Sequence, residues 1–406
     1  MRKSAFLAPL LIVCLLLPVL AGCAGGGEAV TTEPVGTEPI GTEPDVTDPP
    51  ATEPPEQTAP ATTGASAPIP NAYYSVFDYR NYIKLIGRSR LWRGAILVDW
   101  TASGIEFEYQ GSGTIRINVE KDGDVNVDLV AVVDGTSKVV TVDKNGDGTY
   151  VVAERLPSGV HHVLIRRRTM VEYKCNGVML SVKGIQMSGS FLKRPADNPY
   201  KVAFLGDSIT CGMGLASYND GLATYAVDLC TREGFDYDIC SISGIGLYCS
   251  NSRHGYRANT ITQFYPYFNY YRTTTLRYLP DRKADLVIVN LNTNDGTYAS
   301  SPSDEAPYKA ALKTLLSEIR EANGENVKIV WVVGMMIPKD STVNQWLKEV
   351  FDELGGESAG YYRIEVETNT SGGNAHPNLA SHQAVSRALS ALIREKGLLD
   401  LSGDAQ

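Results

Sequence analysis

The spacing of apolar residues changes once along the chain, and this change divides its folded part in two. From about residue 71 to 195 apolar and polar residues alternate, as at Ile105, Phe107 and Tyr109, which are separated by glutamates. Short alternating runs that are interrupted by Gly, Asp and Asn are typical of antiparallel strands with one buried face. Residues 71–195 are therefore predicted to form a small antiparallel β-sandwich.

A different pattern begins at about residue 199 and continues to 397. The apolar run Val202–Leu205 is followed by apolar residues at helical spacing over 222–230, and strand and helix patterns then alternate up to a last helix that ends before Gly397. Such alternation predicts an α/β domain with a parallel sheet covered by helices on both faces. Ligands of these domains bind at the carboxyl ends of the strands.

The first 23 residues have the features of an export signal. Arg2 and Lys3 precede the apolar run Ala5–Leu20, which is short and interrupted by prolines, as in a signal peptide. The run ends in Leu-Ala-Gly-Cys23, which resembles the lipobox of bacterial lipoproteins. This resemblance implies cleavage before Cys23, its lipidation, and a protein anchored on the outer face of the cell membrane. The alternative is a plain secretory signal with an incidental cysteine.

Residues 24–70 have the composition of a disordered linker. The triplet Thr-Glu-Pro occurs four times, ten of the 21 prolines fall here, and there are eight acidic residues but no basic ones. Such a segment buries too little apolar surface to offset the entropy of ordering it. Because most of the net charge of −9 lies in this linker, the folded part has no basic surface that would indicate a nucleic-acid partner.

Ser208 directly follows the first strand of the α/β domain, in the run Gly206–Thr210. A serine at that turn has backbone N–H groups around it that favour an oxyanion, although a helix N-cap serine would look the same. A nucleophilic serine needs a base. His376 lies in the loop before the last helix, at the same sheet edge, whereas His382 falls in the helical stripe and is expected to pack or to cap.

Two further segments are expected at the same edge. Gly244 follows the strand around 236–240, and Asn294 follows the strand 287–291. A glycine N–H and an asparagine side-chain amide are the donors that an oxyanion hole requires. Each segment alone is equally well explained as a turn.

Together these segments resemble the four blocks of the SGNH (GDSL-type) hydrolases, and the fuller pattern is similar to carbohydrate esterase family 2, in which a small β-sandwich precedes the SGNH domain. The resemblance covers about 71–397 and implies an α/β domain with a flavodoxin-like parallel sheet, preceded by a small all-β jelly-roll sandwich. It implies an esterase that removes acetyl groups from carbohydrate hydroxyls without metal or cofactor, with Ser208 as nucleophile and His376 as base. The Ser208 N–H, the Gly244 N–H and the Asn294 side chain would form the oxyanion hole.

The sequence departs from the family pattern beside the histidine. SGNH enzymes usually carry Asp three residues before it, where this chain has Gly373, and the position two before is Asn374. An amide cannot stabilise an imidazolium as a carboxylate does. We expect a Ser–His dyad in which a backbone carbonyl orients His376; the side-chain oxygen of Asn374 is the alternative. A milder departure is Asn292, where the block usually has Gly.

Three other features leave alternatives open. Residues 143–154 match the expression of a calcium loop, but their strand-like flanks favour a hairpin turn. The aromatic residues of segment 264–271 are suited equally to stacking on sugars and to packing a loop. After processing, five cysteines remain, an odd number, so at least one is a free thiol or pairs with another chain.

The substrate class is open as well. The leading hypothesis is a surface esterase acting on acetylated polysaccharide or oligosaccharide, such as xylan or glucomannan. Peptidoglycan or host glycans, or a lipase-like reaction, are alternatives. Because of the departure at Gly373 and Asn374, a non-catalytic carbohydrate-binding protein is a third hypothesis.

Overall fold

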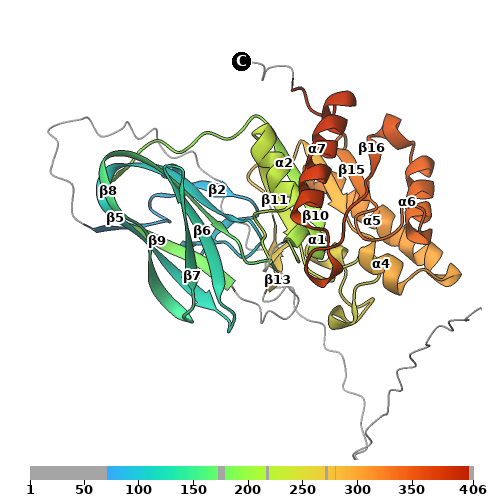
Figure 1. Cartoon of the computed structure of the whole chain (residues 1–406), viewed down its shortest axis with the longest axis horizontal. Helices are drawn as coiled ribbons and strands as arrows, with labels where there is room; N and C mark the ends of the chain where they lie inside the picture. Colours follow the sequence, from blue (N-terminus) through green and yellow to red (C-terminus); the bar gives the residue numbers. More distant parts are fainter. Residues whose placement is uncertain (1–70, 172–178, 216–218, 270–272, 279, 402–406) are drawn as a thin grey trace, which may run out of the picture. The chain divides into compact units, whose positions relative to one another are not determined.

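A computed structural model describes residues 71–171, 179–215, 219–269, 273–278 and 280–401 (Figure 1). The predicted signal segment with Cys23 and the predicted linker 24–70 lie outside these residues, as does Cys175. No helix among the described residues combines the length and the apolar composition needed to cross a membrane.

The N-terminal domain is built of antiparallel strands, as predicted. Hydrogen bonds join them in the order β3-β4-β9-β5-β8-β6-β7, with β1 beside β9 and β2 beside β5. The strands are β1 (Ala72–Ser75), β2 (Lys84–Ile86), β3 (Arg90–Trp92), β4 (Ala95–Leu97), β5 (Gly104–Asp122), β6 (Val127–Val133), β7 (Thr136–Val142), β8 (Gly146–Arg167) and β9 (Met179–Phe191).

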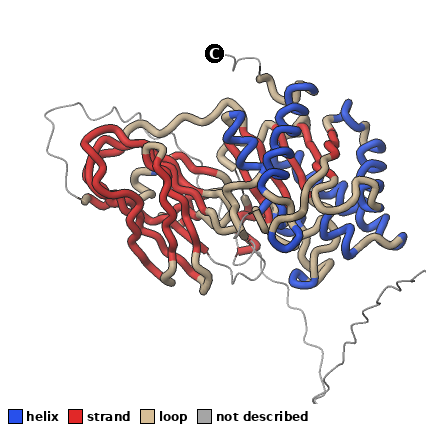
Figure 2. Tube along the Cα trace, viewed as in Figure 1, coloured by secondary structure: helices blue, strands red, loops and turns tan. Residues whose placement is uncertain are grey.

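Three long strands let this sheet enclose a core (Figure 2). Ile105 in the first half of β5 and Ile117 in its second half are both fully buried in the same apolar cluster. Between them the register of β5 against β8 shifts around Gly111 and Gly113. Such irregularities bend a strand, so one continuous sheet curves around the core instead of forming two separate sheets.

The C-terminal domain contains a parallel sheet of five strands in the order β11-β10-β14-β15-β16. This is the flavodoxin-like order, in which the first strand lies between the second and the third, and it confirms the predicted fold class. The strands are β10 (Lys201–Gly206), β11 (Asp236–Ser241), β14 (Leu286–Asn290), β15 (Lys328–Val333) and β16 (Tyr361–Glu365). A separate hairpin consists of β12 (Tyr267–Asn269) and β13 (Thr273–Arg277).

Helices cover both faces of this sheet because successive strand residues point to opposite sides. In β10, Val202 and Phe204 join one apolar cluster with α2 and α7, whereas Ala203 and Leu205 join another with α5 and α6. The helices are α1 (Ser208–Cys211), α2 (Tyr225–Glu233), α3 (Ile261–Phe264), α4 (Thr293–Tyr298), α5 (Glu305–Asn323), α6 (Thr342–Glu353) and α7 (Leu379–Glu395).

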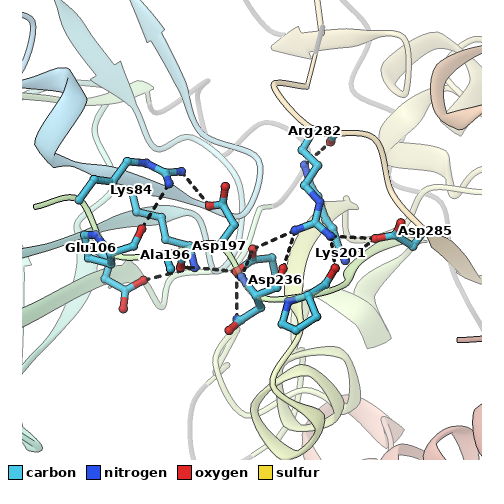
Figure 3. Close-up of polar contacts among 12 residues, drawn as sticks. Lys84, Glu106, Ala196, Asp197, Lys201, Asp236, Arg282 and Asp285 are labelled. Atoms are coloured by element: carbon cyan, nitrogen blue, oxygen red, sulfur yellow. Dashed lines mark hydrogen bonds and ion pairs between the residues drawn. The ribbon is translucent and has the colours of Figure 1, made fainter. Parts of the chain in front are cut away.

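Charged side chains connect the two domains at the amino ends of β10 and β11 (Figure 3). Lys84 of β2 is 3% exposed, and its Nζ lies 2.8 Å from Asp236 Oδ1 and 2.9 Å from the Ala196 carbonyl oxygen. The guanidinium of Arg88, also buried, donates to the carbonyls of Tyr265 and Tyr267. A buried ammonium or guanidinium is tolerated only when it is paired and hydrogen-bonded in this way.

The structure also bears on two of the open alternatives. Residues 143–145 join β7 to β8, and residues 146–154 lie in β8, so the strand-like flanks are confirmed. The segment is not a hairpin, because β7 pairs with β6 and the start of β8 pairs with β5. The Asp147 carboxylate pairs with Lys183. In the aromatic segment, Phe264, Tyr265 and Phe268 are buried in the core, so these three rings pack and do not present a face to sugars. Tyr270 and Tyr271 lie outside the described residues. The four described cysteines are free and buried.

Candidate active site

Ser208 lies where β10 gives way to α1, and its hydroxyl is not used as a helix cap. The N-cap is Asp207, whose Oδ1 accepts a hydrogen bond of 3.0 Å from the Ile209 N–H. The capping interpretation of Ser208 is therefore wrong. Ser208 is 6% exposed, and its hydroxyl is left available for His376.

The structure brings Ser208 and His376 together. Ser208 Oγ lies 2.8 Å from His376 Nε2, and His376 Nδ1 lies 2.9 Å from the backbone carbonyl oxygen of Asn374. A carbonyl oxygen can only accept, so Nδ1 carries the proton and Nε2 is left with a lone pair. This tautomer lets Nε2 accept the hydroxyl proton of Ser208, which is what a general base requires.

The residue that orients His376 is Asn374, and it does so through its backbone. Asn374 and Ala375 both have positive φ angles, of 55° and 56°, and asparagine tolerates this left-handed conformation better than most residues. Hydrogen bonds from Gly372 N to His376 O and from Gly373 N to Gly214 O hold the loop. The geometry thus corresponds to the expected backbone orienter and not to the side-chain alternative.

Burial lowers the pKa of His376, and the hydrogen bonds with the backbone of Asn374 and Gly373 oppose this effect only in part. Without a carboxylate partner the imidazole is held in its neutral form. Neutral imidazole is the form that can act as a base.

His382 has a structural role, as expected. Its Nδ1 accepts a hydrogen bond of 3.0 Å from the Tyr225 N–H in the first turn of α2, and its ring stacks on that of Tyr225. Burial lowers the pKa of His382 to about 3.

The loop after β11 carries Gly244 and is fixed to α4. Asn294 Nδ2 donates to the Ile245 carbonyl over 2.7 Å, which orients the amide and leaves its second hydrogen for a ligand. The Asp295 carboxylate, fully buried, accepts from the N–H groups of three successive residues of the loop, Leu247, Tyr248 and Cys249. The sequence analysis did not predict this anchoring role of Asp295.

Gly244 cannot be replaced without disturbing the loop. Its φ is 83°, and a Cβ there would lie 2.1 Å from Asn251 Nδ2. The preceding N–H, that of Ser243, donates to the Val171 carbonyl over 3.1 Å. Within the described part of the chain, neither the Ser208 N–H nor the Gly244 N–H is used in a hydrogen bond, so both are available to an oxyanion.

Two exposed tyrosines, Tyr256 and Tyr298, lie in the segments around Gly244 and Asn294; the sequence analysis did not identify them. Tyr298 ends α4, which begins one residue before Asn294, and Tyr256 follows the turn that contains Asn251. Their ring centroids are 5.6 Å apart in an edge-to-face arrangement, and the two residues are 43% and 45% exposed. Exposed tyrosines of this kind can contact the apolar face of a sugar.

Comparison with known sequences agrees with the two-domain fold. Residues 204–395 match the GDSL-like Lipase/Acylhydrolase family, and residues 85–188 match the Carbohydrate esterase 2 N-terminal family. The cellulase/esterase CelE of Acetivibrio thermocellus is 26% identical over 322 residues, which cover 73% of this chain and 37% of that protein. The chain thus spans little more than a third of this relative's length.

Solved structures share the arrangement of both domains. A family two carbohydrate esterase from Clostridium thermocellum, in complex with cellohexaose, is 25% identical with a TM-score of 0.67, covering 78% of this chain and 100% of that one. The acetyl xylan esterase Est2A of the rumen bacterium Butyrivibrio proteoclasticus is 21% identical with a TM-score of 0.70, covering 82% and 100%. The resemblance stated from the sequence is confirmed for both domains: residues 204–395 form a GDSL-like (SGNH) hydrolase domain, and residues 85–188 match the N-terminal domain of carbohydrate esterase family 2.

Proposed function

We propose that this chain is a serine esterase that removes O-acetyl groups from carbohydrate. The observation that carries the proposal is the 2.8 Å contact between Ser208 Oγ and His376 Nε2, with Nδ1 bound to a carbonyl acceptor. This contact supplies an activated hydroxyl and a base of the correct tautomer.

The reaction proceeds through an acetyl-enzyme. Ser208 Oγ attacks the carbonyl carbon of the acetyl ester while its proton passes to His376 Nε2. The negative charge on the carbonyl oxygen is stabilised by the N–H groups of Ser208 and Gly244 and by the Asn294 amide. As the bond between the carbonyl carbon and the sugar oxygen breaks, His376 gives its proton to that oxygen, and the sugar leaves as a free hydroxyl. Water then attacks the acetyl-enzyme, with His376 again as base, and acetate is released.

The substrate we propose is an acetylated plant polysaccharide or its oligosaccharides. One relative is described as an acetyl xylan esterase, and another was solved with cellohexaose. The edge-to-face pair of Tyr256 and Tyr298 offers a surface on which a sugar ring of such a chain could lie. Xylan and glucomannan are therefore the first substrates to test.

The test is acetate release from acetylated xylan, acetylated glucomannan and O-acetylated muropeptides, each with wild type and with Ser208→Ala. Release from a plant polysaccharide that disappears in Ser208→Ala supports the proposal. Release from muropeptides alone would assign the enzyme to peptidoglycan. Binding of polysaccharide without release by either protein would make the chain a carbohydrate-binding protein and refute the esterase.

We also propose that the protein is held on the outer face of the cell membrane by a lipid on Cys23. The support is the small residues before this cysteine at the end of an apolar run. Palmitate labelling tests it: wild type should be labelled and Cys23→Ala should not. An unlabelled wild type would refute the anchor.

A further inference from the structure

Another buried histidine, His254, lies outside the dyad, in the loop that carries the Gly244 N–H. It is fully buried, in the one-turn 3-10 helix Ser252–His254. Its Nε2 lies 2.9 Å from the carbonyl oxygen of Ser243. Because a carbonyl oxygen can only accept, Nε2 carries a proton and donates it.

This hydrogen bond acts on the peptide unit that contains the Gly244 N–H. The Ser243 carbonyl and the Gly244 N–H belong to one planar peptide group, in which a trans bond makes them point in opposite directions. A donor that fixes the carbonyl on one side therefore fixes the direction of the N–H on the other. Donation to the carbonyl also polarises the peptide group, which makes its N–H a stronger donor.

The residue His254 is itself held in place by its backbone and by a contact with its ring. Its backbone N–H donates to the Asn251 carbonyl over 3.0 Å, and its own carbonyl accepts from Asn259 Nδ2 over 2.7 Å. Phe264 meets the ring edge-on, with centroids 6.5 Å apart. The Asn251 N–H in turn donates to the Gly244 carbonyl over 2.9 Å. The short segment 251–254 thus fixes the peptide groups on both sides of Gly244.

We propose that His254 is a positioning residue of the oxyanion hole, which orients the Gly244 N–H by donating a hydrogen bond to the Ser243 carbonyl. The proposal rests on the esterase function of this site. His254 touches no reacting atom; it acts through the backbone on a donor that stabilises the transition state. Loss of the His254 imidazole should therefore lower kcat and leave KM nearly unchanged.

A matched pair of variants separates the hydrogen bond from packing. His254→Gln places an amide N–H near the position of Nε2, whereas His254→Met has a similar length and no donor. Complete loss of an oxyanion donor costs about 10²–10³ in kcat, and a misdirected donor should cost less. We expect kcat of His254→Met to fall about 10- to 100-fold with KM within about threefold, and His254→Gln to restore most of it.

Circular dichroism and thermal unfolding must first show that both variants are folded. Equal losses of kcat in the two variants would assign His254 to packing and overturn the proposal. A kcat of His254→Met within twofold of wild type would overturn it too.

The amide NMR signal of Gly244 provides a readout that does not depend on turnover. Because the hydrogen bond is made on its peptide group, this signal should shift in His254→Met and return towards its wild-type position in His254→Gln. If wild type released no acetate, the esterase proposal would fail, and this signal alone would decide the positioning role. An unshifted signal in His254→Met would overturn that role.

Discussion

Replacement of Asn374 by glycine tests how His376 is oriented. The carbonyl that accepts from His376 Nδ1 at 2.9 Å is part of the backbone, so Asn374→Gly retains it. Glycine also adopts the φ of 55° found here without steric cost. Its added flexibility costs roughly 0.5–1 kcal/mol, so kcat/KM should fall by no more than about fivefold.

The alternative orienter predicts a far larger effect. If the side-chain oxygen of Asn374 held the imidazole, its removal would favour the wrong tautomer, which costs about 10⁴ in a protease triad. Initial rates of 4-nitrophenyl acetate hydrolysis and of acetate release distinguish the two outcomes. A loss above about 100-fold in a variant with unchanged circular dichroism and melting temperature would refute the backbone assignment.

Three further outcomes are expected. Since burial lowers the pKa of His376 and the reaction needs neutral imidazole, kcat/KM should rise with pH through a midpoint below the usual 6.5 of histidine; a midpoint above 7 in the pH profile would contradict this. Lys84→Met removes a buried ammonium from its partners and should lower the free energy of unfolding by about 1.5–3 kcal/mol in urea titrations. The control Lys183→Met removes only exposed ion pairs and should lower it by less than about 1 kcal/mol. Equal losses in the two variants would contradict the role given to burial. Tyr298→Ala removes one ring of the exposed Tyr256–Tyr298 pair. If a sugar ring stacks there with about 1 kcal/mol, KM for acetylated oligosaccharide should rise about fivefold with kcat unchanged. An unaltered KM would exclude stacking on Tyr298.

The sequence predicted those parts of the molecule that depend on local patterns. The alternation at Ile105 and Phe107 follows from a strand with one buried face, and the strand over Val202–Leu205 follows from burial on both faces. The meeting of Ser208 with His376 followed from the rule that carboxyl ends of parallel strands share an edge. Their separation of 168 residues along the chain was therefore no obstacle.

Other parts depend on contacts that no local pattern encodes. The use of the Asn374 carbonyl was one of two alternatives, because the choice depends on the left-handed conformations of Asn374 and Ala375. Nothing in the sequence around Lys84 distinguishes it from other strand residues, and its ion pair with Asp236 forms only in the folded chain. The sequence analysis gave His254 no role, because its contact with the Ser243 carbonyl, eleven residues away, is made only in the folded chain.

The hydrogen bond from Ser243 to Val171 has a consequence for how this enzyme can be shortened or recombined. Val171 follows β8 and belongs to the N-terminal domain, so a hydrolase domain excised at residue 199 would lack the acceptor that holds the start of the Gly244 loop. Such a fragment could retain its parallel sheet and its dyad and still lose turnover. We therefore expect that both domains have to be transferred together if this site is to be grafted into another protein.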